Sequence, residues 1–371
     1  MHTPRILVTG IGFVAAPTLH DALAGRLADP PETAPEITAF ETPEGAPAFG
    51  FEAPEFKIET YLPNVKSFVD RTSAFALAAG KLALEDAGLL DREKRPAGLE
   101  IGCAYGTQFG CLEAMEIFWK KVKATNPKFA APLPFTHGYA NSPSSLLCIE
   151  FGLKGSAATF SGESLAGVEA LRFAADQLQT GSAQAVLVCA SESLTRALHA
   201  HLFATKKLSA SGQPALWSGA AEGIVPGEGG AALLLETEAA AAARGRKAYA
   251  ELADVQLAGP GGIAALAHGK PDLLFAAAPS VHDRAERDAW PSAGAQAACI
   301  VPKLFAGELF AAAPLLSAVW AASLLQEHPS PWAKAQAPNG ASRAAASFSD
   351  AAVDALDASG AAGLIRLRRL R

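Results

Sequence analysis

Apolar positions along this chain follow two periods, one typical of helices and one typical of buried strands. Leu165, Val168, Leu171, Ala175 and Leu178 recur at helical spacing. Short apolar runs bounded by Gly, Pro or polar residues predict strands instead. The predicted strands are 5–12, 98–105, 155–160, 183–190, 231–236, 249–255, 272–277, 296–301 and 363–367. The predicted helices include 74–87, 112–123, 140–151, 310–326 and 349–356. This alternation indicates α/β layering.

Several segments carry weaker patterns. The first strand, 5–12, ends in what we expect to be a glycine turn, but no G-x-G-x-x-G motif follows, so a dinucleotide site is not indicated. Residues 29–60 are rich in Pro and Glu and predict an irregular excursion, and residues 258–270 predict a loop. The helix over 74–87 has a cap signal in Asp70.

The composition limits the classes of function. The chain has 371 residues, of which 50% are apolar and 18% charged, which suits two closely packed halves or one large α/β unit, with further surface buried in an oligomer. A net charge of −6 argues against a nucleic-acid partner. The five cysteines form no C-x-x-C pair, so we expect a reduced, cytoplasmic setting and no zinc site. We also expect no secretion signal and no membrane span, because long apolar runs are missing.

The segment Ser161-Gly-Glu-Ser164-Leu-Ala-Gly167 joins a predicted strand to a predicted helix. A serine at such a junction lies near outward-pointing N–H groups and the positive end of the helix dipole. Its small neighbours, including Gly162 and Ala166, would let a substrate approach closely. The pattern therefore indicates a nucleophile elbow at Ser164. The alternative is that Ser164 is only the N-cap of the helix.

These segments, taken in order, resemble the β-ketoacyl synthases, the condensing enzymes of fatty-acid and polyketide synthesis. The resemblance implies a thiolase-like α/β fold of five layers, αβαβα, made of two similar halves. The halves would be residues 1–240 and 241–371 in one compact unit, with a dimer formed beside the nucleophile. The segments that carry the resemblance are 5–12, 70–78, 151–155, 181–192, 227–236 and 243–251.

The same resemblance places four catalytic elements of the family, and each departs from the family pattern. Ser164 falls at the nucleophilic cysteine, and Ala277 falls at the histidine of the N-A-H-G-T-x-T motif. In the K-x-x-x-G-H motif Lys303 is kept, but Glu308 replaces the histidine. Ser347-Phe-Ser-Asp350 falls at the glycine-rich G-F-G-G loop. Together the departures predict a pseudoenzyme that has lost condensing activity.

Other side chains are candidates by position alone. Phe203 and Phe348 are aromatic residues that could line an acyl pocket, and core packing is the alternative for both. His137 lies in the region that the family places near the dimer interface and the substrate tunnel, so we expect packing or a substrate contact. Glu308 could instead form a salt bridge with Lys303 or Arg284. The resemblance implies no metal, flavin or nucleotide cofactor.

Three functions remain open. The preserved scaffold and altered chemistry favour a non-condensing partner of an active ketosynthase, like the chain-length-factor subunits of polyketide systems. Such a chain would be a homodimer or a heterodimer with a ketosynthase, and would meet acyl chains on acyl carrier protein or coenzyme A. Alternatively, Ser164 is the nucleophile of an acyltransferase or esterase, with Glu308 or His282 as its base. In the third hypothesis, the fold is an adaptor or scaffold protein.

Overall fold

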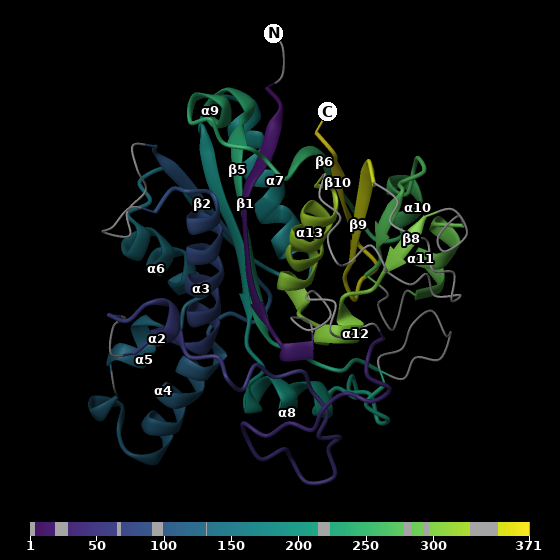
Figure 1. Ribbon diagram of the computed structural model, residues 1–371. Helices are drawn as coiled ribbons and strands as arrows, with labels where there is room; N and C mark the ends of the chain where they lie inside the picture. The colour runs from purple at the N-terminus through teal and green to yellow at the C-terminus, as the bar shows by residue number, and fades with distance from the viewer. Residues whose placement is uncertain are drawn as a thin grey trace.

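In the described part of the chain, ten strands form a single sheet in the order β3-β2-β4-β5-β1-β6-β10-β9-β7-β8 (Figure 1). The structure is a computed structural model that describes residues 4–18, 29–64, 68–90, 99–130, 132–213, 223–277, 283–291, 297–326 and 348–370. The strands are β1 Ile6–Ala15, β2 Ile101–Thr107, β3 Ala157–Ser161, β4 Ala185–Glu192, β5 Gly229–Thr237, β6 Ala250–Ala258, β7 Leu273–Phe275, β8 Ala298–Ile300, β9 Asp350–Leu356 and β10 Ala362–Arg368.

Helices pack on this sheet in layers. Two of them, α7 and α13, lie between the two halves of the sheet, one running from β3 to β1 and the other from β6 to β8. Helix α7 contacts β2 and β6, and α13 contacts β5 and β9. On the outer faces α3 packs on β1 and β5, and α10 packs on β6 and β10. The helices are α2 Ile58–Tyr61, α3 Arg71–Asp86, α4 Leu112–Ala124, α5 Pro132–Thr136, α6 Ser142–Phe151, α7 Ala166–Gln179, α8 Arg196–Ala204, α9 Glu238–Ala243, α10 Ile263–Leu266, α11 Asp283–Ala289, α12 Lys303–Ala306 and α13 Ala313–Leu324, with 3₁₀ turns η1 Pro127–Phe129 and η2 Phe310–Ala312. The predicted α/β layering is confirmed.

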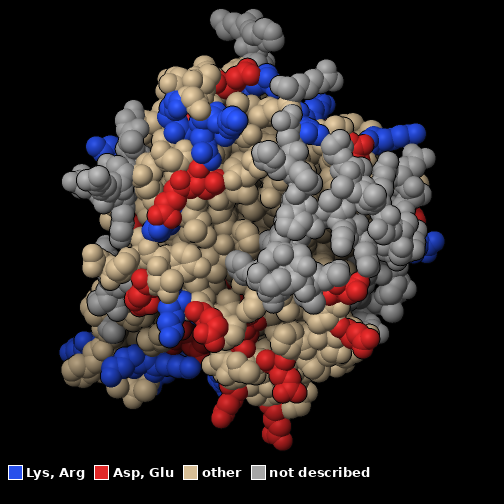
Figure 2. Space-filling view, in the orientation of Figure 1, with Lys and Arg blue, Asp and Glu red and all other residues tan. Residues whose placement is uncertain are grey.

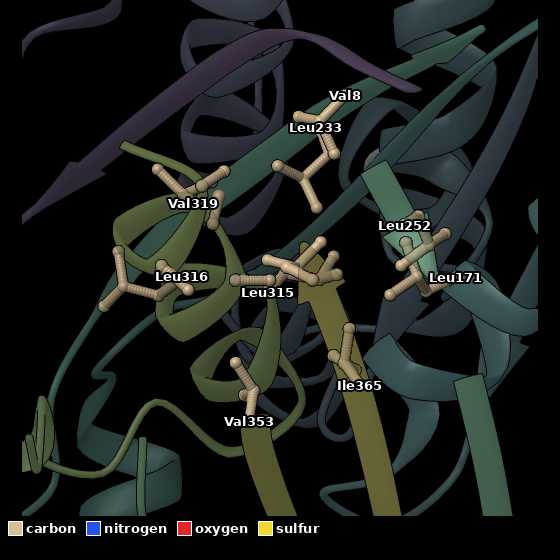
Figure 3. Close-up of a cluster of buried hydrophobic side chains, with 14 of the residues drawn as sticks. Val8, Leu171, Leu233, Leu252, Leu315, Leu316, Val319, Val353 and Ile365 are labelled. Carbon is tan, nitrogen blue, oxygen red and sulfur yellow. The ribbon is translucent and has the colours of Figure 1, made fainter. Parts of the chain in front are cut away.

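The main hydrophobic core lies between the two halves of the sheet, around α7 and α13. Figure 3 shows Leu315 and Val319 of α13 pointing toward Leu233 of β5 and Val353 of β9. All but two residues of α13 are buried, so the helix is apolar on every side and not amphipathic. Helix α7 of this layer begins two residues after Ser164, and the first turns of α13 line the same cavity as Ser164.

The segment 349–356 is not the helix that its alanines predict, because it forms strand β9 between β7 and β10. Alternate residues serve opposite faces of the sheet. Ala351 and Val353 pack into the central core, whereas Ala352 and Leu356 pack into a separate outer cluster. Burial on both faces and pairing on both edges outweigh the helical propensity of alanine.

The glycine turn expected in the first strand is also wrong, because β1 continues through Gly10 and Gly12 to Ala15. The glycines instead let helix α3 approach the strand. A Cβ atom on Gly12 would lie 2.2 Å from the carbonyl oxygen of Ala79, and one on Gly10 equally close to Ala83. Elsewhere, the predicted loop 258–270 contains the short helix α10, and Asp70 caps α3 as expected, accepting from the N–H of Thr72 at 2.8 Å.

Candidate active site around Ser164

Ser164 lies between strand β3 and helix α7, two residues before the helix begins. The N-cap position belongs to Leu165, and no side chain caps the helix there, so the N-cap interpretation of Ser164 is wrong. The half-buried hydroxyl of Ser164 instead donates to Oε1 of Gln108 at 3.0 Å. The serine proton therefore points at an amide carbonyl, which is too weakly basic to remove it.

Four positions that the sequence analysis selected line one small cavity, which we name the Ser164 cavity. They are Ser164, Ala277, Lys303 and Glu308. The cavity has a volume of about 40 Å³. That volume holds a few water molecules or a group of similar size. The structure thus brings these segments together, whereas His282 lies outside the described residues.

Glu308 is held on both carboxylate oxygens. The ammonium group of Lys303 donates to Oε2 at 3.1 Å, and the backbone N–H of Phe310 donates to Oε1 at 2.9 Å. The side chains of Lys303 and Glu308 are 14% and 16% exposed, so water screens this ion pair only partly. The salt bridge to Lys303 expected as an alternative for Glu308 is present. Within the described residues no hydrogen bond connects Glu308 to Ser164.

Phe310 forms a wall of the cavity that the sequence analysis missed. Its backbone is in the left-handed region at φ = 50°, which is rare for a bulky residue. The ring is buried edge-on against Phe109, with centroids 4.8 Å apart. The sequence offered one signal for this residue, its position two residues after Glu308. The backbone N–H of Phe310 donates to Glu308, which is also paired with Lys303.

A buried carboxyl group fixes the loop that carries Gln108. Glu192, at the end of β4, accepts from the hydroxyl of Thr107 at 3.1 Å and from the backbone N–H groups of Gln108 and Phe109. Glu192 is fully buried, and this desolvation raises its pKa to about 8. The side-chain amide of Gln108 also donates to Glu163 at 3.2 Å, so Gln108 is held at both ends of its amide group.

Asp354 of β9 adds a second buried carboxyl group to the cavity wall. Its Oδ2 atom accepts from the indole N–H of Trp290, and its buried Oδ1 atom has no hydrogen-bond partner among the residues that the structure describes. Desolvation, followed by the nearby Glu286 carboxylate, raises the pKa of Asp354 well above its usual value. The sequence analysis missed Asp354 because it assigned this segment to a helix.

The described residues of the segment proposed for the glycine-rich loop, 348–350, are not among those that line the cavity. Ser347 lies outside the described residues, and Phe348 and Ser349 lie just before β9, with Phe348 buried in the central core. The cavity is lined by the opposite end of β9, at Asp354–Leu356. The equivalence of 347–350 to that loop stays a prediction.

The remaining candidates lie away from the cavity lining. Phe203 is half-buried on α8, and His137 follows α5 with its ring edge-on to Phe68 at 5.7 Å. Neither lines the Ser164 cavity. Among the described residues no group of three or more His, Cys, Asp and Glu side chains is arranged to hold a metal ion. Nor does any helix in the described ranges have the length and apolar character needed to cross a membrane.

Comparison with known proteins gives the family. Residues 25–241, more than half of the chain, match the model of the β-ketoacyl synthase N-terminal domain. The chain belongs to the β-ketoacyl synthase family. It is 30% identical over 257 residues to the 3-oxoacyl-[acyl-carrier-protein] synthase 2 of Synechocystis sp., an alignment that covers 67% of this chain and 61% of the relative. The alignment thus spans about six tenths of that relative's length.

Solved structures of ketosynthases have the same fold. The ishigamide ketosynthase/chain length factor superimposes with a TM-score of 0.80 at 19% identity, covering 100% of both chains. A type II polyketide synthase acyl-carrier protein in complex with its ketosynthase gives 0.74 at 18% identity, again over 100% of both chains. At these identities the superpositions establish the thiolase-like ketosynthase fold. Within that fold, this β-ketoacyl synthase family member has Ser164, Ala277 and Glu308 around one cavity.

Proposed function

We propose that this chain is a non-condensing, chain-length-factor-like partner of an active ketosynthase in fatty-acid or polyketide-type synthesis. The observation that carries the proposal is the hydrogen bond from Ser164 to Gln108, in which the hydroxyl proton faces an amide carbonyl and, among the described residues, no base. Glu308, the alternative base, is engaged by Lys303 and by the backbone of Phe310.

The demands of decarboxylative condensation support the proposal. That reaction needs a strong nucleophile, acid–base groups and donors for the developing oxyanion. A serine hydroxyl is a weak nucleophile unless a base activates it. Loss of acid–base assistance costs about 10²–10⁴-fold in rate, and loss of an oxyanion donor costs about 10²–10³-fold. Among the described residues that line the Ser164 cavity none is a histidine or a cysteine.

The surface of the chain supports a partnership. Strand β3 stands at one edge of the sheet, and three of its five residues are half-buried and two exposed. An unpaired edge strand favours the addition of a strand from another chain. The similarity to a ketosynthase/chain length factor structure makes a homologous ketosynthase the partner proposed here. Another similar structure contains a ketosynthase in complex with its acyl-carrier protein. We therefore also propose that the complex formed by this chain acts on an acyl chain bound to a carrier protein.

Co-expression with the ketosynthase encoded nearest to this chain tests the proposal. We expect the two chains to co-purify as a heterodimer that extends a carrier-bound acyl chain. Replacing the nucleophilic cysteine of the ketosynthase should abolish extension. This chain alone, given acyl and malonyl carrier protein, should form no carbon–carbon bond, and condensation by it alone would refute the proposal.

A further inference from the structure

Two of the five cysteines form a contact between strand β2 and helix α6. Cys103 is fully buried in β2, and Cys148 is half-buried on α6. Both belong to the hydrophobic cluster on the face of the sheet that α3 and α6 cover, with Cys103 inside the cluster and Cys148 packed against it. The pair therefore joins two elements that are 45 residues apart in the sequence, since 148 minus 103 is 45.

Backbone hydrogen bonds fix the helix beside the strand close to this pair. Cys148 lies in the last turn of α6, and the chain returns to β2 a few residues later. There the N–H of Gly155 donates to the carbonyl oxygen of Ile101 at 3.0 Å. The N–H of Cys103 itself donates to the carbonyl oxygen of Ser156 at 2.8 Å. A short connection, bonded on both sides of Cys103, thus holds the end of α6 against β2.

The two thiols are hydrogen-bonded to each other, and this bond gives them different roles. The bond, followed by burial, raises the pKa of Cys103, which keeps its proton as the donor. The same bond lowers the pKa of Cys148, the acceptor. Residues 140–149 contain no charged side chain, and Figure 2 shows mostly uncharged surface at the left, where Figure 1 places α6. The thiolate of Cys148 is therefore stabilised by its neighbouring thiol and not by a lysine or arginine of this segment.

We propose that Cys148 is a thiol that reacts with hydroperoxides, and that Cys103 resolves its oxidised form by closing a disulfide between α6 and β2. In the first step the Cys148 sulfur attacks one peroxide oxygen and the O–O bond breaks. Cys148 becomes a sulfenic acid, and hydroxide leaves. In the second step the Cys103 sulfur attacks the sulfenic sulfur, so the S–S bond forms and the S–O bond breaks. The Cys103 proton leaves with the hydroxyl group as water, so two electrons pass from the thiols to the peroxide.

The disulfide would link α6 to the strand that leads to the Ser164 cavity. Strand β2 ends at Thr107, directly before Gln108, which accepts from Ser164. Because a cross-link restricts the unfolded chain, the oxidised protein should unfold at a higher denaturant concentration than the reduced protein. This inference is independent of the class of partner in the proposed function, since it concerns side chains of this chain alone.

Counting free thiols after treatment with hydrogen peroxide tests the proposal. The full chain is treated, unfolded in N-ethylmaleimide and measured by intact mass spectrometry. The reduced protein should take up five maleimides, and the oxidised protein three, because the disulfide removes two of the five thiols. A protease that cuts after aromatic residues separates Cys103 from Cys111, since Tyr105 and Phe109 lie between them, so the linked peptides identify the pair. Dithiothreitol should restore all five thiols.

Three single variants assign the steps to the two cysteines. Cys103→Ser should stop at the sulfenic acid of Cys148, which dimedone traps, whereas Cys148→Ser should keep all four of its remaining thiols. The control Cys111→Ser should still form the disulfide. Treated wild type that keeps five free thiols, or that forms a disulfide between another pair, would overturn the proposal. Thiol counting and peptide mapping of the wild type give this answer even if a variant fails to fold.

Discussion

The hydroxyl of Ser164 donates to the side-chain carbonyl of Gln108, a residue 56 positions earlier in the chain. Gln108 is in turn held by Glu163 through its amide and by the buried Glu192 through its backbone. The partner of Ser164 is thus an amide fixed by two carboxyl groups. In a serine hydrolase a base would occupy that position.

Ser164→Ala should leave the activity of the assembled heterodimer within about twofold of the wild type, because the Ser164 hydroxyl donates to an amide carbonyl and no base among the described residues is bonded to it. The matched control is Ser317→Ala, since Ser317 also lines the cavity but donates to the backbone of Ala313. The measurement is the rate of chain extension by each complex. A drop of about 10²-fold or more for Ser164→Ala alone would instead identify Ser164 as a nucleophile.

Glu308→Gln should destabilise the fold by about 1–3 kcal/mol, because it leaves the mostly buried ammonium of Lys303 without its counter-charge. Adding Lys303→Met should recover part of that loss. Denaturant unfolding of both single variants and the double variant gives the coupling energy. As a control, Asp176→Asn breaks the exposed Arg172–Asp176 pair and should cost less than about 1 kcal/mol. Additive single effects would contradict an energetic coupling across the pair.

Glu192 should make stability fall as pH rises from about 5 to 8. Its folded pKa of about 8 is above the unfolded value, so in this window the folded state binds more protons than the unfolded state. The stabilisation is complete below the unfolded pKa and is lost as pH rises through the folded pKa. Glu192→Gln cannot titrate and should flatten this slope, by up to about 1.4 kcal/mol per pH unit. Denaturant unfolding at several pH values measures it, and equal slopes in both proteins would rule out Glu192 as the cause.

Gly12→Ala should destabilise the chain by about 3 kcal/mol or more, because the new methyl group would overlap the carbonyl oxygen of Ala79 in α3. Gly259→Ala is the control, since a Cβ atom there would meet nothing within 4 Å. Thermal or denaturant unfolding compares the two. If both variants were equally stable, the close contact between β1 and α3 would not matter energetically.

Much of the fold was predictable because most elements have a clear hydrophobic period. Helix α7 covers the residues predicted by helical spacing from Val168 to Leu178, and strands β4 and β5 overlap their predicted ranges 183–190 and 231–236. Strand β9 did not, because Ala351, Ala352 and Ala355 favour a helix locally and only their position between β7 and β10 makes them a strand. Local propensity could not reveal that position.

The candidate site was predictable only where the sequence retained a motif. The positions of Lys303, Glu308 and Ser164 came from family motifs, and the structure places all three at one cavity. Gln108 and Asp354 belong to no such motif. Gln108 follows β2 and Asp354 lies in β9, and these strands are the second and eighth of the sheet, so no strand pairing relates them. Their contribution depends on long-range packing, which a periodicity analysis does not address.

The two ends of the sheet are joined by one short ladder, in which β1 pairs with β6 only at Ile6, Leu7 and Val8. Strand β1 pairs with β5 along almost its whole length. Few ladder hydrogen bonds therefore join the sheet along the β1–β6 seam, whereas α7 and α13 pack against strands on both sides of it. The buried helix layer is thus a second connection between the two parts of the sheet, beside the short β1–β6 ladder.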